Sequence, residues 1–171
     1  PSPPPSPPSP PPSPIAPWTA LTPVSRLSAT VSNQCGAGYC DPARVKDGDP
    51  TCSDPTVCLG LKVLSGTGQY NWFAVQVPQN ATIGYVVVFN RNDRHSQILS
   101  DYQVWLGDNA GDGEGTTAVQ CGGEQLANGR DDSLPIYSLC GAVTGKTWVT
   151  IKQTQPTSNS ISLHEIFVFA P

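Results

Sequence analysis

The chain has 171 residues, a formal net charge of −4 and 13% charged residues. That length is enough for one domain with a hydrophobic core and a tail. The low, negative charge leaves no basic patch for a phosphate backbone, which argues against nucleic-acid binding. The sequence contains no apolar run of about eighteen residues, so it predicts no transmembrane helix. Because it starts without Met and shows no signal peptide, we expect a mature or excised piece of a longer protein.

The first part of the chain is a tail, in which residues 1–14 are only Pro and Ser. Proline fixes φ and lacks an N–H group, so helices and sheet ladders are both excluded there. The tail is predicted to be an extended polyproline II rod, roughly 40 Å long at about 3.1 Å per residue. We assign residues 1–17 to this linker and 18–171 to a folded domain, with Trp18 as the packing anchor between them. Such a rod also suits an aromatic groove, including one on a neighbouring copy of the domain.

Short apolar runs bounded by turn residues predict strands along the domain. The clearest run, residues 83–89, is β-branched or aromatic on both faces, which is typical of a strand buried on both sides. The run at 72–77 alternates between an apolar and a mixed face. Further strands are predicted at 28–32, 59–64, 102–106, 147–151 and 161–169. No stretch has helical periodicity, so the sequence predicts an all-β sandwich.

Two polar segments interrupt these strands. Residues 90–100 are long enough to leave the sheet, and such an excursion is where a β-sandwich usually presents a binding surface. Residues 107–130 are rich in glycine and contain the acidic run Gly-Asp-Gly-Glu-Gly. That run has no helix–loop–helix setting for calcium, so we expect a flexible surface loop there.

The six cysteines form an even set without a C-x-x-C pair, and both histidines lie far from them. This pattern favours disulfides over a zinc site. A Cys121–Cys140 bond closes a loop of about twenty residues and contributes about 3 kcal/mol. The other four cysteines allow three pairings, of which we prefer Cys35–Cys40 and Cys52–Cys58.

Disulfides imply an oxidising, extracellular setting, and a second motif agrees with it. Asn80, Ala81 and Thr82 form an N-glycosylation sequon in a predicted turn between two strands. Such triplets also arise by chance, but a turn between strands is accessible to glycosylation. We therefore expect a secreted protein with a glycan on Asn80.

Four motifs resemble discoidin domains, also called coagulation factor V/VIII C-type domains, and among these the F-type lectins. YNWFAV at 70–75 resembles the family's WWQVDL strand, and GYVVVFNRN at 84–92 resembles the strand that follows. SDYQVWLG at 100–107 is similar to the F-x-V-x-x-G strand, and LHEIFVF at 163–169 to the closing L-C-E-V-E-V-Y. The resemblance covers about residues 25–170 and implies an eight-stranded jelly roll whose loops at one end form the ligand site. The Pro-Ser tail instead resembles the repeats of plant and green-algal hydroxyproline-rich wall glycoproteins, which carry O-linked sugars.

Fucose-binding members of this family grip sugar hydroxyls with a His, an Arg-x-Asp motif and a later basic residue. Arg91 and Asp93 match the Arg-x-Asp motif. The chain has no His before His95, and the later basic position falls near Ile98. We expect Arg94 and His95, in the same loop, to supply substitute donors. The alternative is that Arg91 and Asp93 form a structural ion pair that closes the loop.

The resemblance also implies a structural calcium ion, held by an N-A-x-D-G-N turn and the Glu of the closing strand. ARVKDGD at 43–49 resembles that turn, although Arg44 stands where the family often has Asn. Three carboxylates are then available to the ion, from Asp47, Asp49 and Glu165. Backbone carbonyls are expected to complete the shell, from Arg44, Cys52 or His164. The alternative is a salt bridge that neutralises the acids without an ion, from Lys46 or Arg44.

The sequence predicts no catalytic site. His95 and His164 have no recognisable partners, no Ser motif precedes a strand–helix turn, and the carboxylates do not pair. We therefore expect that the protein is not an enzyme.

Two functions remain. The first is a secreted, lectin-like module of an extracellular hydroxyproline-rich glycoprotein, which binds glycans of cell-wall or cell-surface glycoproteins. Its loops would hold the stacking and hydrogen-bonding residues Trp18, Tyr39, Arg91, Asp93, Arg94 and His95. The second is a structural subunit of an extracellular coat, cell wall or filament, which self-assembles through the Pro-rich rod. The preserved Arg-x-Asp motif favours the first.

Overall fold

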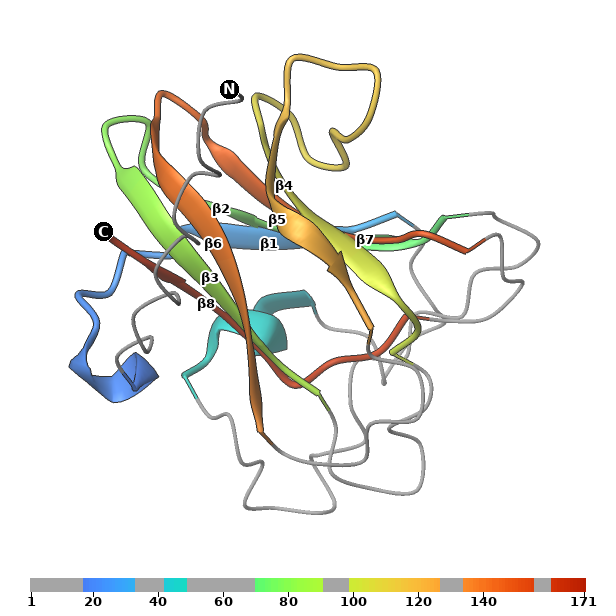
Figure 1. The fold of residues 1–171 in the computed structure, drawn as a ribbon, viewed down its shortest axis with the longest axis horizontal. Coiled ribbons are helices and arrows are strands. Elements are labelled where there is room, and N and C mark those ends of the chain that lie inside the picture. The colour runs from blue at the N-terminus through green and yellow to red at the C-terminus, as the bar shows by residue number, and fades with distance from the viewer. Residues whose placement is uncertain (1–16, 33–41, 49–69, 91–98, 127–133, 156–160) are drawn as a thin grey trace, which may run out of the picture.

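A computed structural model describes residues 17–32, 42–48, 70–90, 99–126, 134–155 and 161–171 (Figure 1). Several predictions fall outside these residues: the polyproline rod, the strand at 59–64 and the first four cysteines. In the part of the chain that the structure describes, no helix has the length and hydropathy needed to cross a bilayer.

The described residues form two antiparallel sheets that pack face to face (Figure 1). The larger sheet has the order β1-β2-β7-β4-β5 and consists of β1 (Ser28–Val31), β2 (Trp72–Gln76), β7 (Trp148–Gln153), β4 (Tyr102–Gly107) and β5 (Val119–Gln125). The smaller sheet has the order β6-β3-β8 and consists of β6 (Pro135–Thr144), β3 (Thr82–Phe89) and β8 (Glu165–Phe169). Two short 3₁₀ helices, η1 (Trp18–Ala20) and η2 (Pro42–Lys46), complete the description. The predicted all-β sandwich is confirmed.

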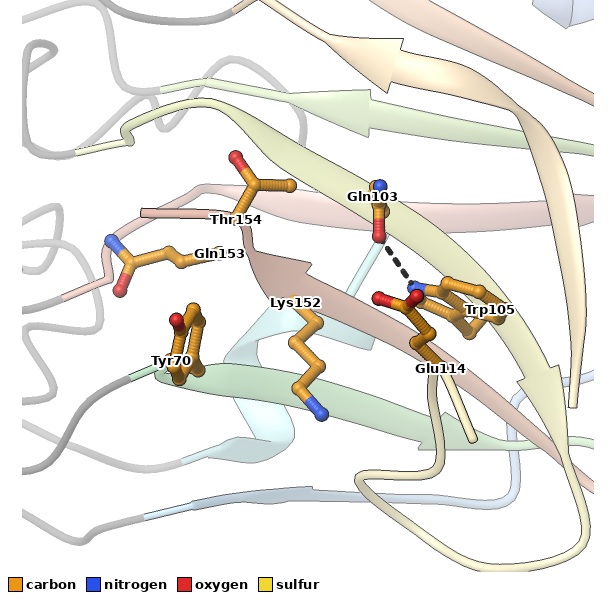
Figure 2. A pocket seen from close by; sticks show the side chains of 7 residues that line it. All are labelled: Tyr70, Gln103, Trp105, Glu114, Lys152, Gln153 and Thr154. Carbon is orange, nitrogen blue, oxygen red and sulfur yellow. Dashed lines mark hydrogen bonds between the residues drawn. The ribbon is translucent and has the colours of Figure 1, made fainter. Parts of the chain in front are cut away.

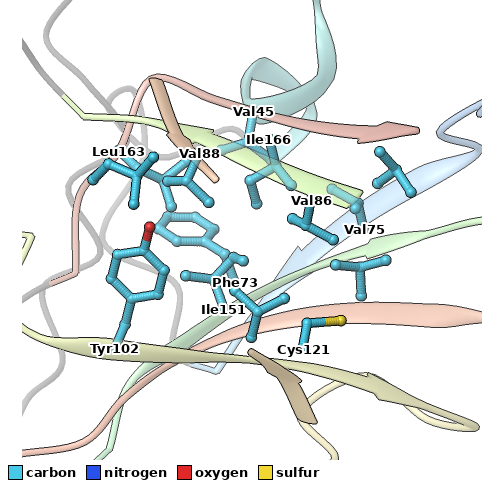
Figure 3. Packing of buried hydrophobic residues seen from close by; sticks show 14 of the residues in the cluster. Val45, Phe73, Val75, Val86, Val88, Tyr102, Cys121, Ile151, Leu163 and Ile166 are labelled. Atoms are coloured by element: carbon cyan, nitrogen blue, oxygen red, sulfur yellow. The ribbon is translucent and has the colours of Figure 1, made fainter. Parts of the chain in front are cut away.

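The hydrophobic core lies between the two sheets (Figure 3). Alternate residues of each strand point inward, for example Phe73 and Val75 on β2, and Val86 and Val88 on β3. The β-branched and aromatic side chains pack well on a pleated surface, which is why these runs form strands. The inner faces together exclude water and hold the two sheets in a fixed relation.

The outer face of β3 is buried as well, as its sequence predicts. Val87 and Phe89 pack there against an aromatic group from the chain's start and end. The Trp18 ring stacks on Phe167 with centroids 5.0 Å apart and meets the edge of Phe89 at 5.5 Å. The backbone N–H of Trp18 donates to the Tyr137 hydroxyl at 3.0 Å. Trp18 is therefore a packing anchor at the start of the domain.

The prediction of a flexible loop over 107–130 is wrong for part of that segment. Its second half forms β5, which pairs with β4 at the edge of the larger sheet. Its first half folds over the outer face of the sheet, where Gly111 donates to the Thr150 hydroxyl at 3.2 Å. A Cβ on Gly111 would lie 2.6 Å from the Trp72 ring, so only glycine allows this approach. The loop thereby covers the start of β2 and the middle of β7.

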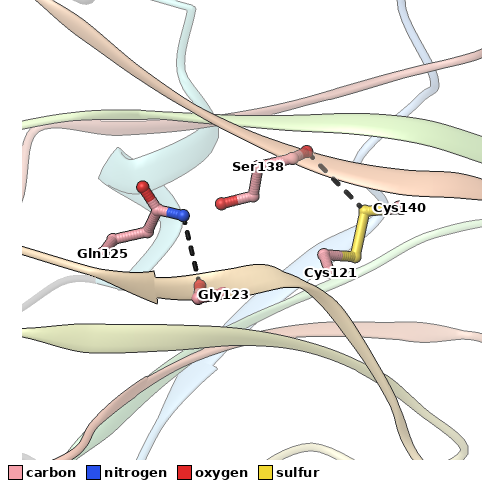
Figure 4. Close-up of a disulfide and its surroundings, with 5 residues drawn as sticks. All are labelled: Cys121, Gly123, Gln125, Ser138 and Cys140. Carbon is pink, nitrogen blue, oxygen red and sulfur yellow. Dashed lines mark hydrogen bonds between the residues drawn. A yellow bond between two sulfur atoms is a disulfide. The ribbon is translucent and has the colours of Figure 1, made fainter. Parts of the chain in front are cut away.

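A disulfide joins the open edges of the sandwich (Figure 4). Cys121 on β5 bonds to Cys140 on β6, and the two residues are 19 positions apart in the sequence. Because β5 and β6 belong to different sheets, the bond links the sheets covalently. The predicted pairing of these two cysteines is confirmed.

Candidate functional site

Several described strands start or finish on the same side of the sandwich, and we call this side the loop end. In the smaller sheet, the end of β3 at Phe89 pairs with the starts of β8 and β6. In the larger sheet, the start of β4 at Tyr102 pairs with the ends of β7 and β5. Residues 90–101 connect β3 to β4, so both sets of ends lie on the same side (Figure 1). Four of the predicted sugar-binding residues belong to this connection and lie outside the described residues: Arg91, Asp93, Arg94 and His95. Tyr39 also lies outside them, whereas Trp18 packs against the outer face of β3 and β8.

A groove of about 370 Å³ opens on the outer face of the larger sheet, next to the loop end (Figure 2). This volume falls in the lower part of the range for small-molecule sites. We call it the sheet groove. It is lined by Tyr70, Gln103, Trp105, Glu114, Lys152, Gln153 and Thr154.

The floor of the sheet groove comes from the strand register. On β4, Tyr102, Val104 and Leu106 point into the core, so Gln103 and Trp105 face outward. Lys152 of β7 pairs with Gln103, which places both side chains in one row across the sheet. The Trp105 indole N–H donates to the Gln103 side-chain oxygen at 3.2 Å, and this bond fixes both side chains (Figure 2).

The two walls come from segments outside the strands. Tyr70, just before β2, forms one wall and is 42% exposed. Glu114, from the loop between β4 and β5, forms the other wall (Figure 2). The same loop presses on Lys152, since a Cβ on Gly113 would lie 3.1 Å from the lysine Nζ. The groove thus combines an aromatic ring with an ammonium, a carboxylate and amides.

Tyr70 has a backbone φ of +63°. This left-handed conformation is uncommon for a bulky residue and costs of order 1 kcal/mol or more. Glycine would adopt it without strain. A strained, exposed aromatic side chain at a groove points to a role outside folding.

The rim of the sheet groove is tied to the segment that leaves the predicted sugar loop. Thr154 donates through its backbone N–H to the Asp101 carbonyl at 3.0 Å. The Gln153 side-chain amide donates to the Ser100 hydroxyl at 2.9 Å. These bonds fix the groove next to the chain that follows residue 98.

The predicted calcium residues Asp47 and Glu165 do come together, at the opposite sheet. Glu165 is fully buried, and its Oε2 accepts from the Gly48 backbone N–H at 3.0 Å. Its side chain also hydrogen-bonds with Asp47. The second oxygen, Oε1, is paired with Arg26, a residue that the sequence did not single out. The Arg26 guanidinium in turn lies over the Phe167 ring, 4.5 Å from its centroid.

In this arrangement a cation of the chain itself already faces Glu165. The guanidinium already supplies the positive charge facing Glu165, and a divalent cation would be repelled by it. Among the described residues, no three His, Cys, Asp or Glu side chains gather to hold a metal. His164 is buried beside Glu165, and the backbone N–H of His164 donates to the Phe89 carbonyl at 2.8 Å. Asp49 and Cys52 lie outside the described residues, so the calcium site stays a prediction.

Burial raises the pKa of the Glu165 carboxyl to about 7, against the lowering effect of Arg26 and the Gly48 amide. At pH values between 4.5, the ordinary pKa of the group, and about 7, its pKa in the folded protein, Glu165 holds a proton in the folded state that it has lost in the unfolded chain. Stability therefore falls as the pH rises through this window. From pH 5 to pH 7 we expect a loss of roughly 2 kcal/mol relative to the Glu165→Gln variant, at about 1.4 kcal/mol per pKa unit. Urea unfolding of both proteins across this range measures it, and a constant difference would contradict the raised pKa.

Comparison with solved structures adds to this geometry. The lectin domain of lectinolysin, complexed with Lewis B antigen, is 20% identical; the match covers 84% of this chain and 92% of that chain, with a TM-score of 0.62. A Streptococcus pneumoniae fucose-binding module is 22% identical, with coverage of 84% and 91% and a TM-score of 0.62. The F5/8 type C domain of a Bacteroides fragilis protein is 16% identical, with coverage of 88% and 96% and a TM-score of 0.55.

The fold is an F5/8 type C-like β-sandwich. These identities are low, so they establish the fold and not the ligand. No protein-family model matches the sequence, and no curated protein matches it. The resemblance seen in the four sequence motifs is confirmed at the level of this F5/8 type C-like fold.

Asn80, the predicted glycosylation site, is exposed in the turn between β2 and β3. That turn is closed by a hydrogen bond from the Ala81 N–H to the Pro78 carbonyl at 2.9 Å. It lies opposite to the loop end, because it joins the end of β2 to the start of β3. A glycan there would leave the loop end and the sheet groove open; its presence stays a prediction.

Proposed function

We propose that this chain is a secreted carbohydrate-binding, lectin-like module of an extracellular hydroxyproline-rich glycoprotein. Its ligands are glycans of cell-wall or cell-surface glycoproteins. The observation that carries the proposal is the sheet groove beside the loop end, with an exposed tyrosine ring and several hydrogen-bonding side chains. Sugars present apolar ring faces and many hydroxyls, so they are bound by such combinations of aromatic and polar groups.

The fold supports the same conclusion. Similar structures include a lectin domain complexed with Lewis B antigen, a fucose-binding module and a chitosan-binding module, and one is in complex with GalNAc-β-1,3-galactose. These are binding modules, which agrees with a non-catalytic role. The disulfide between β5 and β6 supports an extracellular location, because such bonds persist in oxidising compartments.

In this proposal the loop after β3 grips the sugar. Arg91 and Asp93 hold adjacent hydroxyls, the guanidinium as a donor and the carboxylate as an acceptor. Arg94 and His95 supply further donors in place of the family's missing basic groups. The buried residues Asn90 and Leu99 flank this segment and fix where the chain leaves and re-enters the sandwich.

A binding measurement on Arg91→Ala tests the sugar site. With a glycan that the wild type binds, we expect at least about a tenfold loss of affinity, since hydrogen bonds to charged groups are worth about 1.5–3 kcal/mol. The matched control is Lys146→Ala, which removes a cation from the turn between β6 and β7 at the opposite end. Isothermal titration calorimetry reports both values. Equal affinities of wild type and Arg91→Ala would remove Arg91 from the site.

The alternative, a structural subunit of a coat, wall or filament, is favoured by one observation. Trp18 follows the Pro-rich segment and packs against the aromatic group on β3 and β8. A mechanical force applied to the tail would therefore be transmitted to the sandwich. Sedimentation velocity of the domain with and without residues 1–14 tests self-association. A higher assembly state that requires the tail, together with an absence of glycan binding, would establish this alternative.

A further inference from the structure

We propose that the sheet groove is a second subsite, which binds a neutral pyranose unit of an oligosaccharide whose neighbouring unit is held at the loop end. This inference rests on the proposed function and adds to it the length and charge class of the ligand. It assigns roles to side chains of β4, β7 and the segment before β2, away from the loop that contains Arg91.

The first argument is continuity. The bonds from Gln153 and Thr154 to Ser100 and Asp101 join the rim of the groove to the chain that follows the sugar loop. The groove on the outer face of β7 and β4 is therefore fixed beside Ser100 and Asp101, the residues that follow the sugar loop. A single sugar bound at the loop would leave this groove empty.

The second argument is the shape of the groove. It is walled by the Tyr70 ring on one side and by the loop carrying Glu114 on the other, with Lys152 between them (Figure 2). An exposed ring beside an open slot offers a stacking face to the apolar side of a pyranose. Trp105 is only 9% exposed, so it forms the floor and leaves the stacking to Tyr70.

The third argument is charge. Within the described residues, the groove pairs one ammonium, on Lys152, with one carboxylate, on Glu114, and neither takes part in an ion pair there. Hydroxyls of a neutral sugar donate to the carboxylate and accept from the ammonium. With one charge of each sign, the described lining has no net charge that would select a uronate or an amino sugar over a neutral unit.

The fourth argument is the strained backbone at Tyr70. A glycine at this position would relieve the strain in the folded state. A large aromatic residue at this position is not explained by the stability of the fold. Stacking of the Tyr70 ring on a bound sugar explains it.

The test compares glycans of increasing length against four proteins. The wild type is expected to bind an oligosaccharide more tightly than the terminal monosaccharide of the same glycan. Tyr70→Gly is expected to lose about tenfold in affinity for the oligosaccharide, to keep its affinity for the monosaccharide, and to keep or raise its melting temperature. Tyr70→Phe keeps the ring and is expected to bind as the wild type does. Lys152→Met, which keeps the apolar stem, is expected to weaken oligosaccharide binding alone.

Three other results are informative. If the wild type binds glycans but Tyr70→Gly and Lys152→Met bind the oligosaccharide equally well, the subsite is overturned and the proposed function stands. If the wild type prefers a uronate or an amino sugar in the second position, the neutral-sugar assignment is overturned. Failure of the wild type to bind any glycan would overturn the proposed function and this inference with it.

Discussion

Replacing Arg26 by Met is expected to lower the free energy of unfolding by about 1.4 kcal/mol more at pH 8 than at pH 5, which is the cost of keeping a carboxyl with a folded pKa of about 7 protonated at pH 8. Glu165 is fully buried and ionised at that pH, and Arg26, 13% exposed, is the cation paired with it. Methionine keeps the apolar stem but leaves the Glu165 carboxylate without a paired cation. At pH 5 Glu165 is protonated, so the same substitution is expected to cost less. Urea unfolding at the two pH values measures both losses.

Two further variants separate charge from packing at this position. Arg26→Lys keeps the cation and is expected to lose less than Arg26→Met at pH 8. The double variant Arg26→Met with Glu165→Leu removes both charges, and we expect it to recover most of the stability. A loss in Arg26→Met that is equally large at both pH values and persists in the double variant would show that Arg26 acts through packing on Phe167.

Removing the disulfide is the second change with a large expected effect. The double variant Cys121→Ala, Cys140→Ala is expected to unfold with a free energy about 3 kcal/mol lower than the wild type, because the unfolded chain loses a cross-link that closes a loop of about twenty residues. Alanine is chosen because both positions lie in the core, where a serine hydroxyl would be buried. Substitution leaves the other four cysteines intact, which reduction of the protein would not.

Denaturant unfolding followed by tryptophan fluorescence measures this loss. A control pair of alanine substitutions is available at Leu27 and Leu139, which are exposed and should change stability by less than about 0.5 kcal/mol. A disulfide-free variant as stable as that control would show that the packed edges of β5 and β6 hold the two sheets together without the bond.

The sequence predicted the strands whose signal is local. The apolar run that became β3 reads as buried on both faces, and it packs against the core on one side and the Trp18 group on the other. The strand predicted at 161–169 begins later, at Glu165. Its first part is buried too, which explains why it looked like a strand.

The strands β5 and β6 escaped prediction because they lack that signal. β5 is polar and glycine-rich, since it is an edge strand with one exposed face. It forms through pairing with β4 and through the bond from Cys121 to Cys140. Both contacts link residues that are distant in the sequence.

The candidate site escaped prediction for the same reason. The sheet groove takes Tyr70, Gln103, Glu114 and Lys152 from four separate segments, and only the folded sheet brings them together. The register of β4 with β7, for example, places Gln103 beside Lys152. Arg26 pairs with Glu165 across 139 positions, so no local pattern could point to it. The sequence analysis named Lys46 and Arg44 instead, because they lie near Asp47 in the sequence. The alternation along β4 was the one local signal of the groove, because it predicts that Gln103 and Trp105 face outward from the sheet.

The central claim is that this sandwich binds carbohydrate at the loop end and along the sheet groove. A glycan-array screen of the recombinant domain tests it most directly. The account predicts binding to a defined neutral oligosaccharide, weaker binding to its terminal monosaccharide, and a reduced signal for both Arg91→Ala and Tyr70→Gly. Binding to no glycan at all by the folded, disulfide-intact wild type would contradict it.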